Sequence, residues 1–185
     1  MSNELLSSRP LYEGWFDLLM LRIRQGTETF DRTLVRHPSG AAVLCYDPDR
    51  RVALTISELR AGVLFLGAPT LTEAIAGVVE DEDHAACARR EAMEEGGVRL
   101  GALEPVGRVW MTPSSTTERV QLFLAAYSAA DRVAAGGGLA EEGERLTVRE
   151  VPLRELWAIA DAGERMDAKT FMLLQALRLR RPDLF

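Results

Sequence analysis

The centre of the sequence holds one helix-forming stretch, Asp83 to Gly96, flanked on both sides by apolar runs of strand length. The stretch is rich in Ala, Glu, Arg and Met, which favour helices. Asp81 or Asp83 can cap its start, and Gly96 with Gly97 can end it. Since strands precede this helix, more strands follow it and helices close the chain, the order predicts an α/β or α+β fold with a mixed sheet between helices.

The first half of the chain contains several strand-like segments. They are predicted at residues 12–24, 28–36, 41–46, 51–59 and 71–79. Residues 12–24 also fit a helix, because their apolar positions match both periods. The turn Asp47-Pro48-Asp49-Arg50 joins two apolar runs, which predicts a β-hairpin.

After the central helix the pattern returns to strands and then to helices. Strands are predicted at 105–111 and 118–127, a Gly- and Glu-rich loop at 131–145, and two helices, one from near Pro152 and one from about Asp167 to Arg180. No internal repeat and no linker divides the chain, whose 185 residues fit one domain with a small appended element.

Composition and charge exclude several classes of protein. The net charge is −6 and no Lys/Arg run forms a basic stripe, so a nucleic-acid partner is not expected. No apolar run approaches the roughly 18 residues of a membrane-spanning helix, so no membrane partner is expected either. The N-terminus lacks the order of a signal peptide, and the chain has only two cysteines, Cys45 and Cys87. A cytoplasmic location is therefore expected.

Three glutamates, Glu91, Glu94 and Glu95, lie close together on the predicted helix. Glu91 and Glu95 are four residues apart, so they stand one above the other and repel each other. One interpretation is a solvated acidic face paired with neighbouring arginines. The other is a site for Mg²⁺, or Mn²⁺ as a substitute, because hard oxygen ligands suit these cations. The cluster alone leaves both open.

The surrounding residues resemble a known family. The segment AGVVEDEDHAACARREAMEEGGV resembles the Nudix box, in which a glycine, a glutamate and the pattern Arg-Glu-x-x-Glu-Glu-x-Gly stand at fixed spacings. Two departures occur: only four residues separate Gly77 from Glu82 where the motif has five, and Ala92 replaces an aliphatic residue. The shortened spacing resembles the branch that contains GDP-mannose and ADP-ribose pyrophosphatases. Three later segments also resemble that branch: MTPSSTTERVQLFLAAY, GGGLAEEGERLTV and DAKTFMLLQAL.

The resemblance implies roles for residues of the box. Glu91 and Glu95 are expected to bind Mg²⁺ together with the backbone carbonyl of Ala76. Glu94 is expected to be a further ligand or an anchor for the ligands, and Arg90 to orient the glutamates. In the acidic loop, Glu142 or Glu144 is the expected base that deprotonates the attacking water, with Glu142 favoured.

Substrate contacts are expected at four further positions. Arg32 and Arg60 align with arginines that hold phosphate or sugar in similar enzymes, and Glu118 with an acidic position of the branch. Trp15 either stacks on a nucleobase or forms a buried core or dimer contact. Ser57-Glu58 and Ser114-Ser115 depart from the branch, which leaves the preferred sugar open.

Together these features predict a Nudix α/β/α sandwich with a mixed β-sheet. Residues 1–37 are expected to form N-terminal strands used in dimerisation and substrate binding, and residues 38–185 the Nudix domain. The expected activity is Mg²⁺-dependent hydrolysis of a nucleoside diphosphate sugar by a homodimer, with GDP-mannose favoured over ADP-ribose. The alternative is a Nudix-fold module that binds nucleotides without hydrolysing them.

Overall fold

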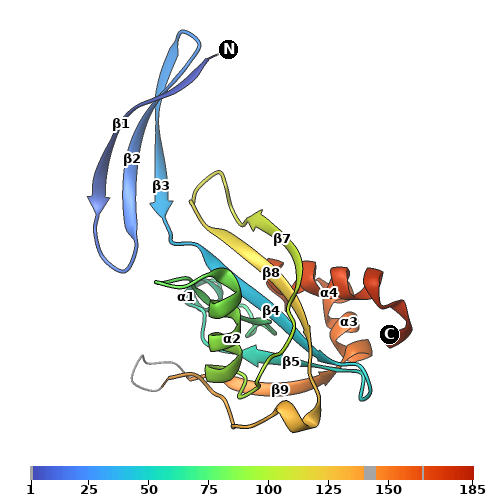
Figure 1. The fold of residues 1–185 in the computed structure, drawn as a ribbon. Coiled ribbons are helices and arrows are strands. Elements are labelled where there is room, and N and C mark those ends of the chain that lie inside the picture. The colour runs from blue at the N-terminus through green and yellow to red at the C-terminus, as the bar shows by residue number, and fades with distance from the viewer. Residues whose placement is uncertain (1, 140–144, 164) are drawn as a thin grey trace. The chain divides into compact units, whose positions relative to one another are not determined.

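The computed structural model describes residues 2–139, 145–163 and 165–185 (Figure 1). The chain forms two compact units. The first contains the residues up to Ser39 together with Val109–Val120, and the second contains Gly40–Arg108 and Gln121–Phe185.

The first unit is built on a three-stranded antiparallel sheet. Its strands, in spatial order, are β1 (Asn3–Tyr12), β2 (Asp17–Gln25) and β3 (Glu28–Arg36). Gly26 lies in the tight turn between β2 and β3 with φ +61°, a conformation that glycine adopts without steric cost. At the far end of this hairpin Asp17 stands opposite Arg36 and forms an ion pair with it. The extended alternative for the segment that begins at residue 12 is therefore confirmed, although the strand starts at Asp17.

A six-stranded sheet has the order β7-β8-β4-β5-β9, and β6 pairs with β4. It belongs to the second unit except for the last residues of β7 and the first residues of β8, which the first unit includes. The strands are β4 (Gly40–Asp47), β5 (Val52–Ser57), β6 (Ile75–Val78), β7 (Glu104–Trp110), β8 (Arg119–Ala126) and β9 (Thr147–Pro152). The expected hairpin is confirmed, since Cys45 faces Leu54 and Asp47 faces Val52 across β4 and β5. Asp47 Oδ1 accepts hydrogen bonds from the backbone N–H groups of Asp49 and Arg50 and so closes the turn.

Four α-helices are present in the part of the chain that the structure describes. They are α1 (Ala61–Phe65), α2 (His84–Glu94), α3 (Leu153–Ala162) and α4 (Ala168–Arg180). Asp83 is the N-cap of α2, because its carboxylate accepts hydrogen bonds from the N–H groups of Ala85 and Ala86. None of the described helices is long and apolar enough to cross a membrane.

The core lies on both faces of the large sheet. Leu54 and Ile56 of β5 belong to one cluster of buried residues with Cys87, Ala88 and Ala92 of α2. On the C-terminal helices, buried leucines face inward: Leu153, Leu156, Leu173, Leu174 and Leu177. The expected α/β class with helices packed on a sheet is confirmed, and Figure 1 shows α2 and the α3–α4 pair as separate layers.

Several boundaries differ from the sequence-based expectations. The strand expected at 71–79 covers only Ile75–Val78, because Glu73 forms an isolated bridge with Ile56 instead of continuing the strand. Strands β1 and β9 and the short helix α1 were not predicted. Every residue of β1 is exposed, and its sequence NELLSSRPLY does not alternate apolar with polar residues.

Candidate active site

Glu91 of α2 and Glu95, the C-cap residue of α2, lie against the strand β6. Glu91 is 8% exposed and Glu95 is 3% exposed, so both carboxyl groups are buried. Glu95 Oε2 accepts a hydrogen bond of 3.1 Å from the N–H of Ala76. A Cβ added to Gly77 would lie 1.7 Å from Glu91 Oε1. The glycine therefore leaves the space that the Glu91 carboxylate fills, and the structure brings Ala76, Glu91 and Glu95 together.

Arg90 connects the acidic residues around this pair. Its Nη1 lies 2.8 Å from Glu91 Oε1 and donates a 2.9 Å hydrogen bond to Glu94 Oε2. Its Nε donates to Glu82 Oε1 at 2.9 Å. Burial lowers the pKa of Arg90, but the hydrogen bonds with Glu82 and Glu94 and the charge of Glu91 outweigh it, so that the pKa is raised and the side chain stays charged. Arg90 thus fixes the positions of the surrounding glutamates through charge-assisted contacts.

The donor set suits a hard divalent cation. Carboxylate and backbone carbonyl oxygens are the ligands that Mg²⁺ prefers, and Mg²⁺ takes its remaining ligands from water and substrate. Two buried carboxylates next to the Ala76 backbone supply the protein's share of such a site. Within residues 2–139, 145–163 and 165–185, no three side chains of Asp, Glu, His or Cys converge as a complete metal site. Glu94 differs from the pair in burial, since its side chain is 25% exposed, and it is bound to Arg90.

The end of α2 is joined to the chain segment that leads into the acidic loop. The carbonyl of Gly97 accepts hydrogen bonds from the N–H groups of Val133 and Ala134, and the carbonyl of Glu95 accepts one from Gly137. Gly97 and Gly136 have φ values of +62° and +71°. A Cβ on Gly136 would lie 2.3 Å from the Glu95 carbonyl oxygen, so the two backbones meet at a distance that only glycine permits.

These contacts cap the helix and position the start of the loop. The expected bases Glu142 and Glu144 belong to this loop and lie outside the described residues.

Arg60, which was predicted to contact the substrate, lies in the second unit. Its Nε and Nη2 each donate a 2.9 Å hydrogen bond to one carboxylate oxygen of Glu73, and its Nη1 pairs with Glu58. Burial lowers the pKa of Arg60, but the hydrogen bonds and charge of Glu73 outweigh this effect and raise it. Glu95 makes a smaller contribution of the same sign to the raised pKa of Arg60.

Glu73 was missed by the sequence analysis. It is 2% exposed and also lies 3.7 Å from Lys169 of α4. The signal that could have found it is a glutamate inside an apolar run, since a buried charge needs a partner.

The other predicted substrate residues lie in the first unit. Trp15 is 87% exposed, so it is not a core residue of this chain. With Asp17, Arg36 and His37 it lines a cavity of about 320 Å³. The guanidinium of Arg32 lies 4.3 Å from the ring centroid of Phe30. Glu118 accepts a backbone hydrogen bond from Met111 and donates one to the hydroxyl of Thr116.

Comparison with known proteins gives the family. A model of the NUDIX domain matches residues 36–173. GDP-mannose pyrophosphatase of Cronobacter sakazakii is 36% identical over 189 residues, which cover 97% of each chain. GDP-mannose pyrophosphatase of Citrobacter koseri is 34% identical over 157 residues, which cover 84% of this chain and 78% of the relative.

A solved structure has the same fold. The protein, described as an ADP compounds hydrolase, superimposes with a TM-score of 0.79 over 99% of this chain and 96% of its own, at 14% identity. The domain match covers the buried glutamate pair, Arg90 and the Gly77 contact, and the sequence relatives extend over most of the chain. The chain therefore belongs to the Nudix family and is a Nudix hydrolase.

Proposed function

We propose that this hydrolase cleaves the diphosphate bond of a nucleoside diphosphate sugar in the presence of Mg²⁺ and releases a nucleoside monophosphate and a sugar phosphate. GDP-mannose is the favoured substrate, because the two relatives at 36% and 34% identity are named GDP-mannose pyrophosphatases. ADP-ribose is the next candidate, since the structural relative is described as acting on ADP compounds.

The buried pair Glu91 and Glu95 carries this proposal. Two carboxylates that repel each other are unfavourable in a helix unless a cation offsets their charge. Here both are almost fully buried and lie against Ala76 and Gly77. This arrangement supports a metal-binding role for Glu91 and Glu95, with the Ala76 carbonyl as a backbone ligand.

The remaining residues then have separate tasks. Mg²⁺, when bound, supplies charge that neutralises the diphosphate oxygens. Arg90 keeps Glu91 and Glu94 in place through its ion pairs. Glu142, or else Glu144, accepts the proton of the attacking water.

We further propose that residues 1–37 serve in dimerisation and substrate binding, while residues 38–185 carry the catalytic chemistry. In a homodimer, Trp15 would stack on the nucleobase, which agrees with its exposure of 87%. Arg32, Arg60 and Glu118 are the proposed contacts to the phosphates and sugar. The oligomeric state can be measured by light scattering coupled to size-exclusion chromatography.

A panel of nucleoside diphosphate sugars tests the activity. The full chain is incubated with each substrate and Mg²⁺, and the products are identified by mass spectrometry. Glu95→Gln should lower kcat by about 10² or more, because it removes one charge of the proposed metal pair. Asp161→Asn, an exposed carboxylate of α3, is the matched control and should retain wild-type turnover.

The alternative is a domain that binds nucleotides without hydrolysing them. It would be favoured by saturable binding of a nucleotide sugar with no product formed in the presence of Mg²⁺. If Glu95→Gln hydrolyses as fast as the wild type, the proposed metal role of Glu95 is wrong.

A further inference from the structure

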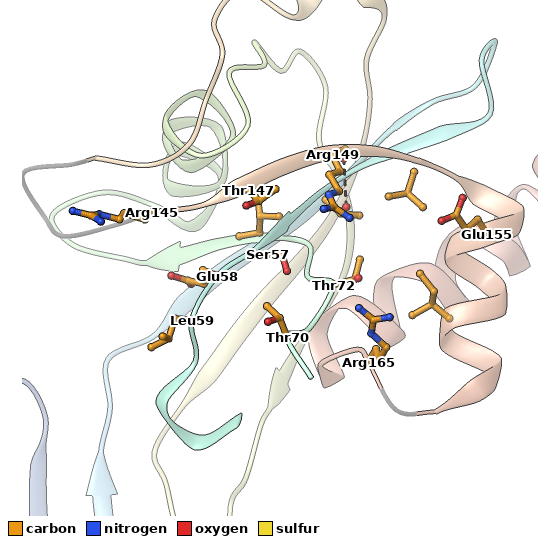
Figure 2. A pocket seen from close by; sticks show the side chains of 14 residues that line it. Ser57, Glu58, Leu59, Thr70, Thr72, Arg145, Thr147, Arg149, Glu155 and Arg165 are labelled. Atoms are coloured by element: carbon orange, nitrogen blue, oxygen red, sulfur yellow. Dashed lines mark hydrogen bonds between the residues drawn. The ribbon is translucent and has the colours of Figure 1, made fainter. Parts of the chain in front are cut away.

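A polar cavity of about 530 Å³ lies in the second unit between strands β5 and β9, residues 70–72 and helix α3 (Figure 2). Its volume is within the range of about 300–1,000 Å³ that is typical of small-molecule sites. Its walls come from segments far apart in the sequence, including Ser57 of β5, Arg149 of β9 and Arg165 between α3 and α4. The fold, rather than one loop, forms this cavity.

The cavity lies on the face of the sheet opposite α2. Successive residues of a strand point to opposite faces. Leu54 and Val148 pack with the core cluster that contains the α2 residues. Their neighbours Thr55, Thr147 and Arg149 line the cavity instead. The cavity is therefore separated by the sheet from the core that packs against the catalytic helix.

Three arginines give the cavity an excess of positive charge. Arg145, Arg149 and Arg165 line it, and none of them forms an ion pair with a carboxylate of the part of the chain that the structure describes. Two glutamates also line the cavity. Glu58 is paired with Arg60, and Glu155 lies on α3, at the side of the cavity formed by that helix.

Hydroxyl groups lie among the arginines. They are those of Ser57, Thr70, Thr72 and Thr147. Figure 2 shows Ser57 and Thr72 in the space between Arg149 on β9 and Arg165 below it. A hydroxyl and a guanidinium can both donate hydrogen bonds to an anion, and the planar arginine fork matches two oxygens of a phosphate.

The wall that carries Arg165 is fixed by backbone contacts. The N–H of Thr72 donates a 2.8 Å hydrogen bond to the carbonyl of Arg165, and Thr72 also bridges Met166. On the other wall, the Thr55 hydroxyl donates to the carbonyl of Arg149. These bonds use backbone atoms of Arg149 and Arg165 and do not involve their guanidinium groups. A site held in place before binding loses less free energy on ordering.

We propose that this cavity is a second anion site that binds a small phosphorylated molecule, either inorganic phosphate or a phosphomonoester. Three guanidinium groups with interspersed hydroxyls fit the dense charge and several acceptor oxygens of a phosphate group. An extended nucleic acid does not fit, because it binds along a long basic surface and not inside a cavity of about 530 Å³. This site goes beyond the proposed hydrolysis, since it lies on the other face of the sheet from α2.

The test measures binding without catalysis. The full chain is titrated with inorganic phosphate in EDTA by isothermal calorimetry, at constant ionic strength and with chloride as the reference anion. A second arm uses mannose 1-phosphate and a third uses GMP. Arg149→Gln and Arg165→Gln are the test variants, singly and together. Arg154→Gln on α3 is the matched control, because Arg154 is exposed and does not line the cavity.

We expect saturable phosphate binding that each single variant weakens by about tenfold, since each removes a charge-assisted contact. Arg154→Gln should bind as the wild type does. A tighter Kd for one phosphomonoester that Arg149→Gln and Arg165→Gln also weaken identifies an organic phosphate as the ligand of the cavity. An equal or tighter Kd for inorganic phosphate, weakened by the same variants, identifies the free anion. The proposal is overturned if no phosphate arm binds more tightly than chloride, or if Arg149→Gln and Arg165→Gln retain the wild-type Kd. Because EDTA prevents Mg²⁺-dependent turnover, neither result depends on whether the enzyme hydrolyses nucleotide sugars.

Discussion

The guanidinium of Arg60 is bound to the buried carboxylate of Glu73 by two parallel hydrogen bonds of 2.9 Å, Nε to Oε1 and Nη2 to Oε2. Glu73 is 2% exposed, whereas the Arg60 side chain is 40% exposed. The arginine therefore compensates a charge inside the fold while one edge of it stays accessible to solvent.

Removal of Arg60 should destabilise the protein as well as weaken substrate binding. Among the residues that the structure describes, Arg60→Met leaves Glu73 with Lys169 as its ion-pair partner, at 3.7 Å. We therefore expect the free energy of unfolding to fall by about 2–3 kcal/mol. The matched control is Arg181→Met, which breaks a more exposed pair with Glu104 and should cost less than about 1 kcal/mol. Urea denaturation measures the free energy of unfolding of both variants. An equal loss in the two variants would show that burial of Glu73 has no special energetic effect.

Gly77 should be essential to the geometry of the glutamate pair. Its φ is outside the left-handed region, so alanine fits the backbone. The added Cβ would meet the Glu91 carboxylate at 1.7 Å, and this carboxylate must move. Gly77→Ala should lower kcat about tenfold or more, because even a 1 Å displacement of a catalytic group is costly.

The control for this change is Gly101→Ala, whose Cβ would meet nothing within 4 Å. Steady-state kinetics with titrated Mg²⁺ should show reduced activity only in Gly77→Ala. Wild-type kcat and Mg²⁺ dependence in Gly77→Ala would contradict the placement of Glu91 at the metal.

Sequence patterns predicted those parts of the fold that are determined by residues close together in the sequence. The Asp83 cap, the β4–β5 hairpin and the helix α4 all follow from short-range chemistry, and each is present. The strand β1 could not be predicted, because all of its residues are exposed and its pairing with β2 defines it.

The same distinction applies to the site. Glu91 and Glu95 could be found from their spacing and their resemblance to the Nudix box. The partnership of Arg60 with Glu73 spans 13 residues and two segments, so only the three-dimensional structure reveals it. The arginines of the second cavity are spread from residue 145 to residue 165 and form no motif in the sequence.

The Gly136 backbone lies close to the end of α2. Substitution of Gly136 by alanine should therefore destabilise the protein more than the same substitution at a glycine that has a positive φ but no close neighbour. Gly136→Ala introduces both a strained φ of +71° and a contact of 2.3 Å with the Glu95 carbonyl. We expect a loss of about 2–4 kcal/mol in unfolding free energy. Gly163→Ala has a similar φ of +76° with nothing within 4 Å, so it should cost only about 1 kcal/mol. Equal losses would mean that the contact with α2 does not constrain Gly136.

The acid stability of the second unit should depend on Glu150. Hydrogen bonds from Arg50, at 2.7 and 2.8 Å, lower the pKa of Glu150 from its ordinary value of 4.5, and the Tyr127 hydroxyl adds a further hydrogen bond. Because the pKa is lower in the folded state, this stabilisation is present above pH 4.5 and is lost as the pH falls through the folded-state pKa.

Glu150→Gln should therefore cost about 1 kcal/mol at pH 7, a modest value because the pair is partly exposed. The difference from the wild type should shrink as the pH is lowered below 4.5. Urea denaturation at pH 7, 5 and below 4.5 measures the trend. If the difference in unfolding free energy between the wild type and Glu150→Gln stays constant across these pH values, ionisation of Glu150 is not linked to folding. If the difference decreases with pH, the Arg50–Glu150 pair is one source of acid sensitivity.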